Sequence, residues 1–362
     1  MLTAGRAAGA KDSRSSSDRQ RIESSPRAAR AADDIAVYGV DKTTGYTLWT
    51  YESDTATPFD FGYLRTVAKV DGVSVAFLTD TSSGLTIHAV YVDGVNAGTA
   101  KWTRALSGSL FSGHVPAVSD GVVYFGSGST SPYQLHAASV DDGSDLWVHE
   151  LTSGIAWGGG ITVHGGPVTP TGGGRVYFGD QAGNVNMVRR LEISHAVTSR
   201  TSWTYAAGGS PNTPTVDCTG PDGACVVYAT ANSDLHAINA DTGVGKWTFT
   251  GDTVLTHSPT VADGVVYIGD EAPKVYAIDT SAGSEIWSFE TEDSVYSTPI
   301  VHEGVVYAGD GDNKMYAINK DTGAQERGCL ADVGFANRRS DFLDNGFVFE
   351  NMEGQVCVPA GA

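Results

Sequence analysis

The stretch V-Y-A-I-D-T-S-A-G-S-E-I-W-S-F-E-T at residues 275–291 is followed by a shorter copy of itself, M-Y-A-I-N-K-D-T-G, at residues 315–323. The run T-P-I-V-H-E-G-V-V-Y-A-G-D at residues 298–310 separates the two copies. A fixed internal period is typical of a repeat architecture. The fold therefore follows from the repeat, and single residues have to be interpreted within it.

The repeat can be followed through the chain by a Trp that stands four residues after a turn Gly. This spacing occurs in Gly45 with Trp49, Gly143 with Trp147, Gly243 with Trp247, and Gly283 with Trp287. Trp102 and Trp203 mark two looser copies, and Gly323 with Arg327 marks a final copy without the aromatic residue. Seven copies therefore run at intervals of 40 to 56 residues.

Each copy has the pattern of short β-strands. The runs G-V-V-Y-I-G at 264–269 and G-V-V-Y-A-G at 304–309 are β-branched and aromatic, as buried strands are. The next run, such as L-H-A-I-N at 235–239, alternates and ends in a D-T-G turn whose Gly can take a positive φ. Four strands per copy without helical periodicity predict an all-β protein, a β-propeller of four-stranded antiparallel blades.

Counting these runs predicts seven blades. Thr47–Tyr51 has no inner strands before it, and the last inner strands, with Gly346–Glu350, have no Trp run after them. Joining the N- and C-terminal strands in one sheet would remove an open edge. Ile35–Val40 and Val356–Val358 compete for one strand position, so eight blades, or an incomplete eighth blade, is the alternative.

The motif A-I-D/N-x-x-T-G-x-x-x-W, with G-V-V-Y-x-G-D about twenty residues on, resembles the repeat of the pyrroloquinoline-quinone-like propellers over residues 35–358. That family includes quinoprotein alcohol dehydrogenases and the non-enzymatic, BamB-like lipoprotein of the outer-membrane β-barrel assembly machinery. The scaffold hosts unrelated sites, so the resemblance is specific for fold rather than for function. It implies that one set of Trp residues packs between neighbouring blades, namely Trp49, Trp102, Trp147, Trp203, Trp247 and Trp287.

Charge and composition favour an exported protein without nucleic-acid or membrane partners. The chain carries 42 acidic and 23 basic residues, a formal charge of −19, which disfavours nucleic acid and anionic membranes. Residues 1–32 are rich in Ala, Arg and Ser, and we expect a disordered basic tail before a single propeller at 33–362. No apolar run is long enough for a signal peptide or a membrane span, so either an export signal lies upstream or the protein is cytosolic.

The cysteines also favour an extracytoplasmic protein, that is, a secreted, periplasmic or cell-surface one. Cys218 and Cys225 flank T-G-P-D-G-A between two predicted antiparallel strands, where a disulfide would close a hairpin. Cys329 and Cys357 both lie in the closing region and could form a second disulfide. Four buried free thiols are the alternative. The redox state of the compartment in which the protein resides decides between disulfides and free thiols.

No cofactor or metal site is predicted. Quinoprotein dehydrogenases, which the repeat resembles, hold their cofactor against a vicinal Cys-Cys disulfide and a calcium site, and they use more than seven blades. No two cysteines are adjacent here, and H-E-x-x-H, C-x-x-C, G-x-S-x-G and Walker motifs do not occur. Asp310-Gly-Asp-Asn resembles a calcium loop, but Met315 replaces the Gly of the sixth position, so a hairpin turn is predicted.

Two groups of His residues are distinguished by their position in the repeat. One column holds His88, His136 and His236 in some copies and Tyr38, Tyr276 and Tyr316 in others, which indicates packing rather than metal binding. The second group precedes the innermost strands, where loops reach the mouth of the central channel. The candidate binding surface there comprises His114, His257, Trp157, Tyr296, Phe59, Phe61 and Tyr63.

Aromatic and His side chains around one channel mouth suit recognition of a protein partner or a glycan. The alternative is that these loops only pack on one another and plug the channel. We therefore expect a monomeric, non-catalytic scaffold or recognition protein. An enzyme on the same scaffold, either a polysaccharide lyase or a degenerate quinoprotein dehydrogenase, is the second hypothesis. A lyase would need a base and a group that neutralises the uronate carboxylate. Arg65 is the only Arg of the sequence near the inner loops, which counts against a lyase.

Overall fold

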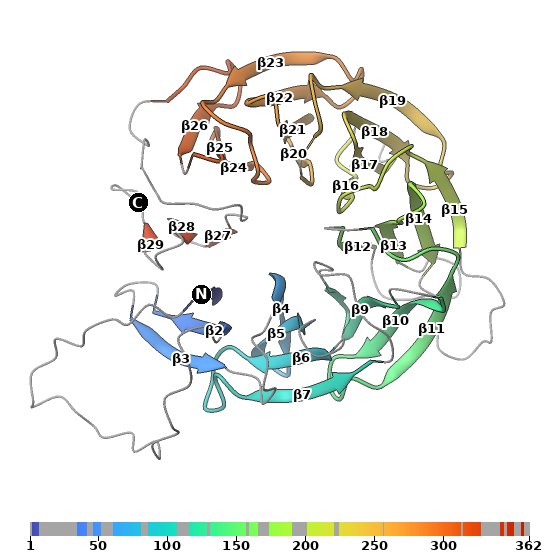
Figure 1. The fold of residues 1–362 in the computed structure, drawn as a ribbon, viewed down its shortest axis with the longest axis vertical. Coiled ribbons are helices and arrows are strands. Elements are labelled where there is room, and N and C mark those ends of the chain that lie inside the picture. The colour runs from blue at the N-terminus through green and yellow to red at the C-terminus, as the bar shows by residue number, and fades with distance from the viewer. Residues whose placement is uncertain are drawn as a thin grey trace, which may run out of the picture.

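The structure of the protein is a computed structural model in which every described element is a β-strand (Figure 1). It describes residues 2–6, 35–41, 46–51, 61–80, 86–106, 116–128, 131–156, 159–165, 174–189, 201–220, 224–255, 257–312, 314–326, 341–343, 346–350 and 356–357. Within these ranges there is no helix of the length and apolar character needed to cross a membrane.

The strands form antiparallel sheets that are arranged in a ring, with the first strand of most sheets near the centre (Figure 1). Sheet 1 comprises β1 (Leu2–Arg6), β2 (Ile35–Val40) and β3 (Thr47–Tyr51). Sheet 2 comprises β4 (Phe61–Val70), β5 (Val73–Asp80), β6 (Thr86–Tyr91) and β7 (Ala100–Ala105). Sheet 3 comprises β8 (Ala117–Ser119), β9 (Val122–Ser127), β10 (Tyr133–Ser139) and β11 (Asp145–Leu151). Sheet 4 comprises β12 (Ile161–His164), β13 (Arg175–Gly179), β14 (Asn184–Arg189) and β15 (Thr201–Ala206).

The second half of the chain repeats the same meander. Sheet 5 comprises β16 (Thr215–Asp217), β17 (Val226–Ala231), β18 (Asp234–Asn239) and β19 (Gly245–Thr250). Sheet 6 comprises β20 (Thr260–Ala262), β21 (Val265–Gly269), β22 (Lys274–Asp279) and β23 (Glu285–Glu290). Sheet 7 comprises β24 (Ile300–His302), β25 (Val305–Gly309) and β26 (Met315–Asn319). Sheet 8 comprises β27 (Asp341–Leu343), β28 (Gly346–Glu350) and β29 (Val356–Cys357). The predicted all-β propeller architecture is confirmed.

The predicted closure of the ring is wrong, because β3 lies in sheet 1 and β28 lies in sheet 8. The described strands thus fall in eight sheets, which agrees with the alternative of an additional blade and not with the count of seven. The physical reason is that β3 already has inner partners: Val37 of β2 pairs with Tyr51, and β1 pairs with β2. Ile35–Val40 and Val356–Cys357 do not compete for one position, since they belong to different sheets.

The expectation that residues 1–32 lie outside the fold is wrong for Leu2–Arg6. These residues form β1, whose register against β2 runs from Leu2 opposite Gly39 to Arg6 opposite Ile35. Residues 7–34 lie outside the described part of the chain. The N-terminal segment therefore supplies the inner strand of sheet 1.

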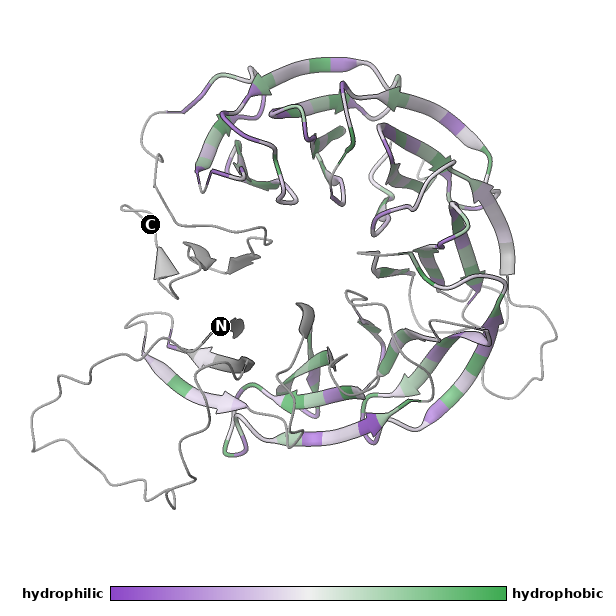
Figure 2. Cartoon of the chain, in the orientation of Figure 1, coloured by the Kyte–Doolittle hydropathy of each residue, from purple (hydrophilic) through white to green (hydrophobic). Residues whose placement is uncertain are grey.

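Burial differs between the middle and the outer strands of a sheet. All six residues of β17 are buried, whereas β19 alternates between exposed and half-buried positions. A middle strand is covered on both faces by the neighbouring sheets, so an uninterrupted apolar run is required there. Figure 2 shows the resulting pattern, with apolar residues along the inner strands and mixed colours along the outer ones. Core clusters consequently lie between sheets, as where Tyr228 of sheet 5 packs with Val266 and Ile268 of sheet 6.

A β-bulge lies beside each Trp of the repeat. In sheet 5 the register between β18 and β19 shifts between Ala237 and Ile238, directly after the pair formed by Ala237 and Trp247. Sheets 1 to 4 and 6 show the same shift next to Trp49, Trp102, Trp147, Trp203 and Trp287. A bulge re-aims the side chains around it, and here it accompanies an indole that is directed at the next sheet.

In the described contacts, five of the six indoles dock on the turn that follows the third strand of the next sheet. Trp247 Nε1 donates a hydrogen bond to Thr280 O at 2.9 Å, and Trp287 Nε1 donates to Lys320 O at 2.9 Å. Trp49, Trp102 and Trp203 make the same bond to Val92, Val140 and Ala240. The turn Gly is required for two reasons. A Cβ at Gly283 would lie 2.5 Å from Trp247 Cδ2, and the φ of Gly283 is +69°, which favours glycine.

Candidate functional site

The candidate site is the set of segments that join the outer strand of one sheet to the innermost strand of the next, here called the linking segments. Residues 291–299 join β23 to β24, and residues 251–259 join β19 to β20. Both reach one common end of the innermost strands, and residues 152–160 occupy the same place between sheets 3 and 4.

One buried apolar residue anchors each of these three segments. Val295 pairs by a single β-bridge with Asp310, and its side chain is completely buried. Leu255 pairs in the same way with Asp270. Ile155 takes the corresponding place opposite Asp180. The backbone of the three segments is therefore held at equivalent points of three sheets.

Buried aspartates hold the other side of these bridges. Asp270 is fully buried; its Oδ1 accepts from Lys274 N at 3.1 Å and its Oδ2 accepts from the Tyr276 hydroxyl at 2.9 Å. The Tyr276 hydroxyl accepts in turn from Asp252 N of the linking segment at 3.2 Å. Burial raises the pKa of Asp270, and burial, opposed in part by the Asp252 N–H, raises the pKa of Tyr276. The carboxyl thus connects its own hairpin to the segment that enters the sheet.

The same arrangement recurs one sheet later. Asp310 accepts from Lys314 N at 2.9 Å and from the Tyr316 hydroxyl at 2.8 Å, and that hydroxyl accepts from Glu292 N at 3.0 Å. Asp310 and Lys314 close the β25–β26 hairpin, so the predicted hairpin turn is confirmed there; Asn313 lies outside the described residues. These bonds fix the segment that carries Tyr296.

Two of the predicted binding residues have described side chains, and they come from consecutive linking segments. His257 is half-buried, and its carbonyl accepts from Thr230 Oγ1 at 2.9 Å. Tyr296 is half-buried beside Gly311, where an added Cβ would lie 3.2 Å from Tyr296 Cε2 and 2.6 Å from Asp293 Oδ2. Gly311 therefore allows both side chains to approach the β25–β26 turn.

The other members of the predicted binding surface are not placed by the structure. Phe59, His114 and Trp157 lie outside the described residues. Phe61 and Tyr63 belong to β4, but their side chains are outside the described part of the chain. A common surface that includes these five residues stays a prediction.

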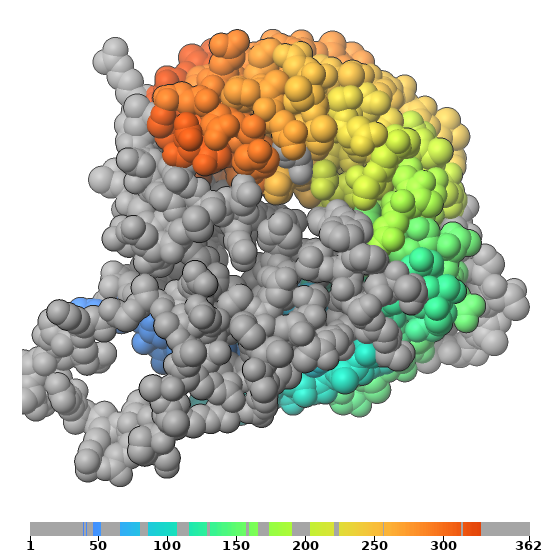
Figure 3. Space-filling view, viewed as in Figure 1, coloured from blue at the N-terminus to red at the C-terminus, as the bar shows by residue number. Residues whose placement is uncertain are grey.

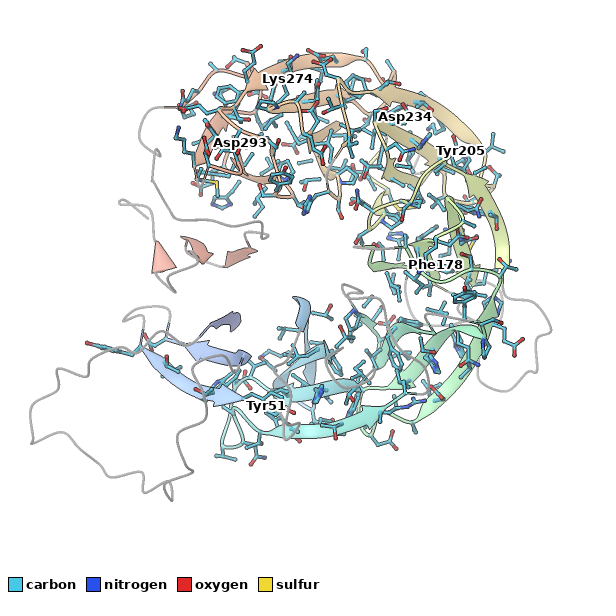
Figure 4. All side chains as sticks on the ribbon, in the orientation of Figure 1. Tyr51, Phe178, Tyr205, Asp234, Lys274 and Asp293 are labelled. Atoms are coloured by element: carbon cyan, nitrogen blue, oxygen red, sulfur yellow. A yellow bond between two sulfur atoms is a disulfide. The ribbon has the colours of Figure 1, made fainter. Side chains whose placement is uncertain are left out.

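The linking segments carry acidic side chains, and Lys residues of the adjoining hairpins pair with some of them. Lys274 Nζ lies 2.5 Å from Asp252 Oδ2, and Lys314 forms an ion pair with Glu292. Asp293, which Figure 4 labels on the linking segment of sheet 7, accepts from Ser294 N at 2.7 Å. This end of the sheets therefore keeps an acidic side chain that is not paired with Lys in the described contacts.

The His residues of the repeat column lie in the third strand of their sheets and are buried. His88 Nδ1 lies 2.9 Å from the Tyr51 hydroxyl, and His236 Nδ1 lies 3.2 Å from the Tyr205 hydroxyl. His136 lies 2.7 Å from Ser127 Oγ and 3.1 Å from Asp145 Oδ1. Burial lowers the pKa of His136 and of His236. Each of these rings bonds to neighbouring side chains within or between sheets, as the packing interpretation expects.

The predicted Cys218–Cys225 disulfide is confirmed. It joins the end of β16 to the start of β17, with the two Cα atoms 4.1 Å apart. The second predicted disulfide is outside the described side chains, because Cys329 and the Cys357 side chain are not described.

Two features of the site were missed by sequence reasoning. The burial of Asp180, Asp270 and Asp310 has a repeated signal, the G-D that ends the G-V-V-Y runs, but of the three only Asp310 is interpreted from the sequence, and as a turn residue. His164, whose Nε2 lies 2.9 Å from Cys218 Sγ, had no local signal at all. Its proximity to the disulfide depends on the packing of two sheets.

Comparison with known proteins places the repeat in one family. The profile described as outer membrane protein assembly factor BamB matches residues 33–200 and 231–326. No curated protein matches the chain at a significant level.

Two solved structures share the fold at low sequence identity. BamB from Moraxella catarrhalis superimposes with a TM-score of 0.60 and 18% identity, covering 91% of this chain and 94% of that one. The computationally designed Ika8 protein gives a TM-score of 0.63 and 17% identity, covering 91% of each chain. At this identity the two structures support the fold alone. The match of the family profile over most of the chain shows that the protein belongs to the outer membrane protein assembly factor BamB family.

Proposed function

We propose that the protein is a non-catalytic, extracytoplasmic scaffold that binds a protein partner through its linking segments. Family membership supports the scaffold, since the family is described as an assembly factor. The Cys218–Cys225 disulfide supports the compartment, because disulfides persist in secreted, periplasmic and cell-surface proteins. Each of these supports is independent of the other.

The observation that carries the proposal is a constant backbone with variable side chains. Ile155, Leu255 and Val295 hold equivalent points of three linking segments. The two residues that follow each anchor differ, being Ala156-Trp157, Thr256-His257 and Tyr296-Ser297. Recognition residues usually stand on loops that a rigid scaffold positions. A scaffold of this kind can present different side chains without any change in its sheets.

Charge indicates which partner surface would fit. The chain carries a formal charge of −19, and Asp252, Glu292 and Asp293 lie in the linking segments. Opposite charge at the rim of an interface steers association and disfavours wrong partners. The contacting surface of the partner should therefore be basic, with an apolar or aromatic centre for Tyr296 to contact.

Site-specific crosslinking in the native host tests the proposal. A photo-crosslinking amino acid at position 257 or 296 should give a discrete adduct with one protein, whereas position 302 should not. His302 is the matched control: it is a His at the opposite end of an innermost strand, with a side chain 37% exposed. The His257→Ala/Tyr296→Ala variant should then bind the purified partner at least about tenfold more weakly, which is about 1.4 kcal/mol.

Three outcomes would overturn the proposal. Equal crosslinking at positions 257 and 302 would show that the linking segments are not the binding surface. A specific glycan adduct without a protein would favour the carbohydrate alternative. Full resistance of the protein to an added protease in spheroplasts, whose periplasm is open to the medium, with digestion only after lysis, would place it in the cytoplasm.

A further inference from the structure

The disulfide has an imidazole from a neighbouring sheet beside it. His164 is the last residue of β12, the innermost strand of sheet 4, while Cys218 and Cys225 flank the hairpin of sheet 5. His164 Nε2 lies 2.9 Å from Cys218 Sγ and 3.6 Å from Cys225 Sγ. All three residues are half-buried, so the cluster is accessible in part.

The packing of the innermost strands, rather than the disulfide, positions the imidazole. His164 pairs with Arg175 at the end of its hairpin, as Asp217 pairs with Val226 in sheet 5. Thr162 Oγ1 also donates to Pro214 O at 2.5 Å, which joins the beginning of β12 to the residue before β16. The same Thr-to-Pro bond links sheets 5 and 6. Cleavage of the disulfide would therefore leave His164 near both sulfur atoms.

Two cysteines and one histidine are ligands that zinc prefers. Zinc binds thiolate at about 2.3 Å and imidazole at about 2.0–2.1 Å in tetrahedral sites, which places sulfur about 3.6 Å from nitrogen. The distance from His164 Nε2 to Cys225 Sγ is already 3.6 Å, and the distance to Cys218 Sγ is 2.9 Å. The three donor atoms lie within 4.8 Å of one another. A shift of about 0.7 Å by the Cys218 sulfur would satisfy the second distance.

We propose that His164, Cys218 and Cys225 form a binding site for a thiophilic divalent cation such as zinc when the disulfide is reduced. A dithiol reductant supplies two electrons and two protons, the sulfur–sulfur bond breaks, two thiols form, and the reductant becomes a disulfide. The metal ion then displaces the two thiol protons and binds His164 Nε2, and a water molecule supplies the fourth ligand. A disulfide oxidant would accept two electrons from the two thiolates and two protons from water to become a dithiol; the sulfur–sulfur bond then re-forms, which removes two ligands and releases the ion.

This site is separate from the proposed partner surface. The innermost strands begin at the linking segments, and His164 and Cys218 lie at the far ends of β12 and β16. Failure of the partner proposal would therefore leave the metal proposal untouched, and the reverse also holds.

Cobalt titration of the full chain tests the proposal. The protein is reduced with dithiothreitol, freed of reductant without oxygen, and titrated with Co²⁺, whose thiolate charge-transfer and tetrahedral d–d absorption report sulfur ligation. We expect one equivalent bound by the reduced protein, displacement by Zn²⁺, and no such spectrum from the oxidised protein. Circular dichroism checks that every variant is folded.

Matched variants identify the ligands. His164→Gln should weaken Co²⁺ binding at least about tenfold, since loss of even an outer-shell partner of a metal costs 10–100-fold. His302→Gln changes the residue at the equivalent position of β24, which belongs to sheet 7 and not to the sheets of the cluster, and should leave the affinity unchanged. Cys218→Ser should abolish the thiolate spectrum, whereas Cys329→Ser should retain it.

Several results would overturn the site. These are the absence of a thiolate spectrum in the reduced wild type, equal affinity in His164→Gln and wild type, or loss of the spectrum in Cys329→Ser with retention in Cys218→Ser. If Cys218→Ser does not fold, the comparison of His164→Gln with His302→Gln decides the question alone.

Discussion

At the scale of residues, an aromatic side chain of an outer strand faces the column residue of the next sheet at four junctions. Tyr205 faces His236, and their polar atoms are within hydrogen-bond distance; Tyr51 faces His88 in the same way. Figure 4 labels the two Tyr residues. Where the column residue is Tyr276 or Tyr316, its hydroxyl is bound to a buried Asp, and the outer strand supplies a Phe. His88 and His236 therefore stand where the facing ring has a hydroxyl, and Tyr276 and Tyr316 stand where an Asp can accept their own. His136 differs, because it bonds to Ser127 and Asp145 of its own sheet.

This matching predicts an asymmetric effect of one hydroxyl group. Tyr205→Phe should lower the free energy of unfolding by about 1 kcal/mol, because the hydrogen bond beside His236 is lost. The reverse change one sheet later, Phe249→Tyr, should not stabilise the protein, since Tyr276 already bonds to Asp270. Urea unfolding of the two variants and wild type measures both effects, and an unchanged midpoint in Tyr205→Phe would contradict the first.

The buried Asp270 predicts a dependence of stability on pH. Because burial raises its pKa in the folded protein, its favourable contribution is complete below the unfolded value of about 3.9 and falls as the pH rises through the folded value. Asp270→Asn removes this titration and keeps one of the two acceptor oxygens, so the bond lost to Lys274 N or to the Tyr276 hydroxyl lowers the stability by the same amount at every pH.

The unfolding midpoint of wild type relative to Asp270→Asn should therefore decrease between about pH 4 and pH 7. Asp321→Asn, at an exposed carboxylate of a turn, is the control, and its difference from wild type should not show this trend. A wild-type midpoint that rises relative to Asp270→Asn over the same range would have the wrong sign.

At the scale of elements, the outer strand of one sheet is the docking element of the next. The indole of Trp287 is 9% exposed, packs on Tyr267 of its own sheet at a ring-centre distance of 5.9 Å, and bonds to the turn of sheet 7. That turn needs Gly323, since an added Cβ would lie 2.8 Å from the indole. The Trp287 side chain thus links its own strand β23, strand β21 of the same sheet and the turn after β26 of the next sheet.

Removal of this link should be costly. Trp287→Ala should lower the free energy of unfolding by about 3 kcal/mol or more, because a large buried side chain and its hydrogen bond are lost together. Ile286→Ala is the matched control, since the adjacent side chain is 48% exposed and should change the stability little. Calorimetry of the two variants measures the difference, and equal melting temperatures would show that the indole does not hold the sheets together.

The sequence predicted most elements because their signals are local. The D-T-G turn at 241–243, before Trp247, and the G-V-V-Y run at 264–267 indicate their conformation within a few residues. The disulfide was predictable for the same reason, since its cysteines flank one hairpin. β1 was not predictable: L-T-A-G-R lacks an apolar alternation, and it becomes a strand only by pairing with β2, about thirty residues later. The position of His164 likewise depends on packing between sheets.

At the scale of the whole molecule, the sheets from sheet 4 to sheet 7 form a continuous band of packed atoms (Figure 3). The chain as a whole has a formal charge of −19, so this compact form brings like charges together. Self-repulsion of that kind destabilises a compact state and is screened by salt. Stability should therefore depend on ionic strength.

We expect the melting temperature to rise as NaCl increases from about 0.01 M to about 0.5 M, because the screening length falls from about 30 Å to a few ångströms. Most surface ion pairs, such as Lys274 with Asp252, contribute too little to reverse the trend when they are screened. Differential scanning fluorimetry at several NaCl concentrations measures the effect. A melting temperature that falls with salt would mean that ion pairs outweigh the net repulsion.

The one-way docking of each Trp on the following sheet has a consequence for how such proteins evolve. Five described junctions use the same indole, turn Gly and carbonyl, so a unit running from one of these Trp residues to the next carries a complete pair of joining surfaces. Duplication or deletion of such a 40-residue unit, as from Trp247 to Trp287, would conserve every junction and change only the circumference. Genes of this kind can therefore gain or lose a blade by unequal recombination, without the simultaneous invention of a new contact.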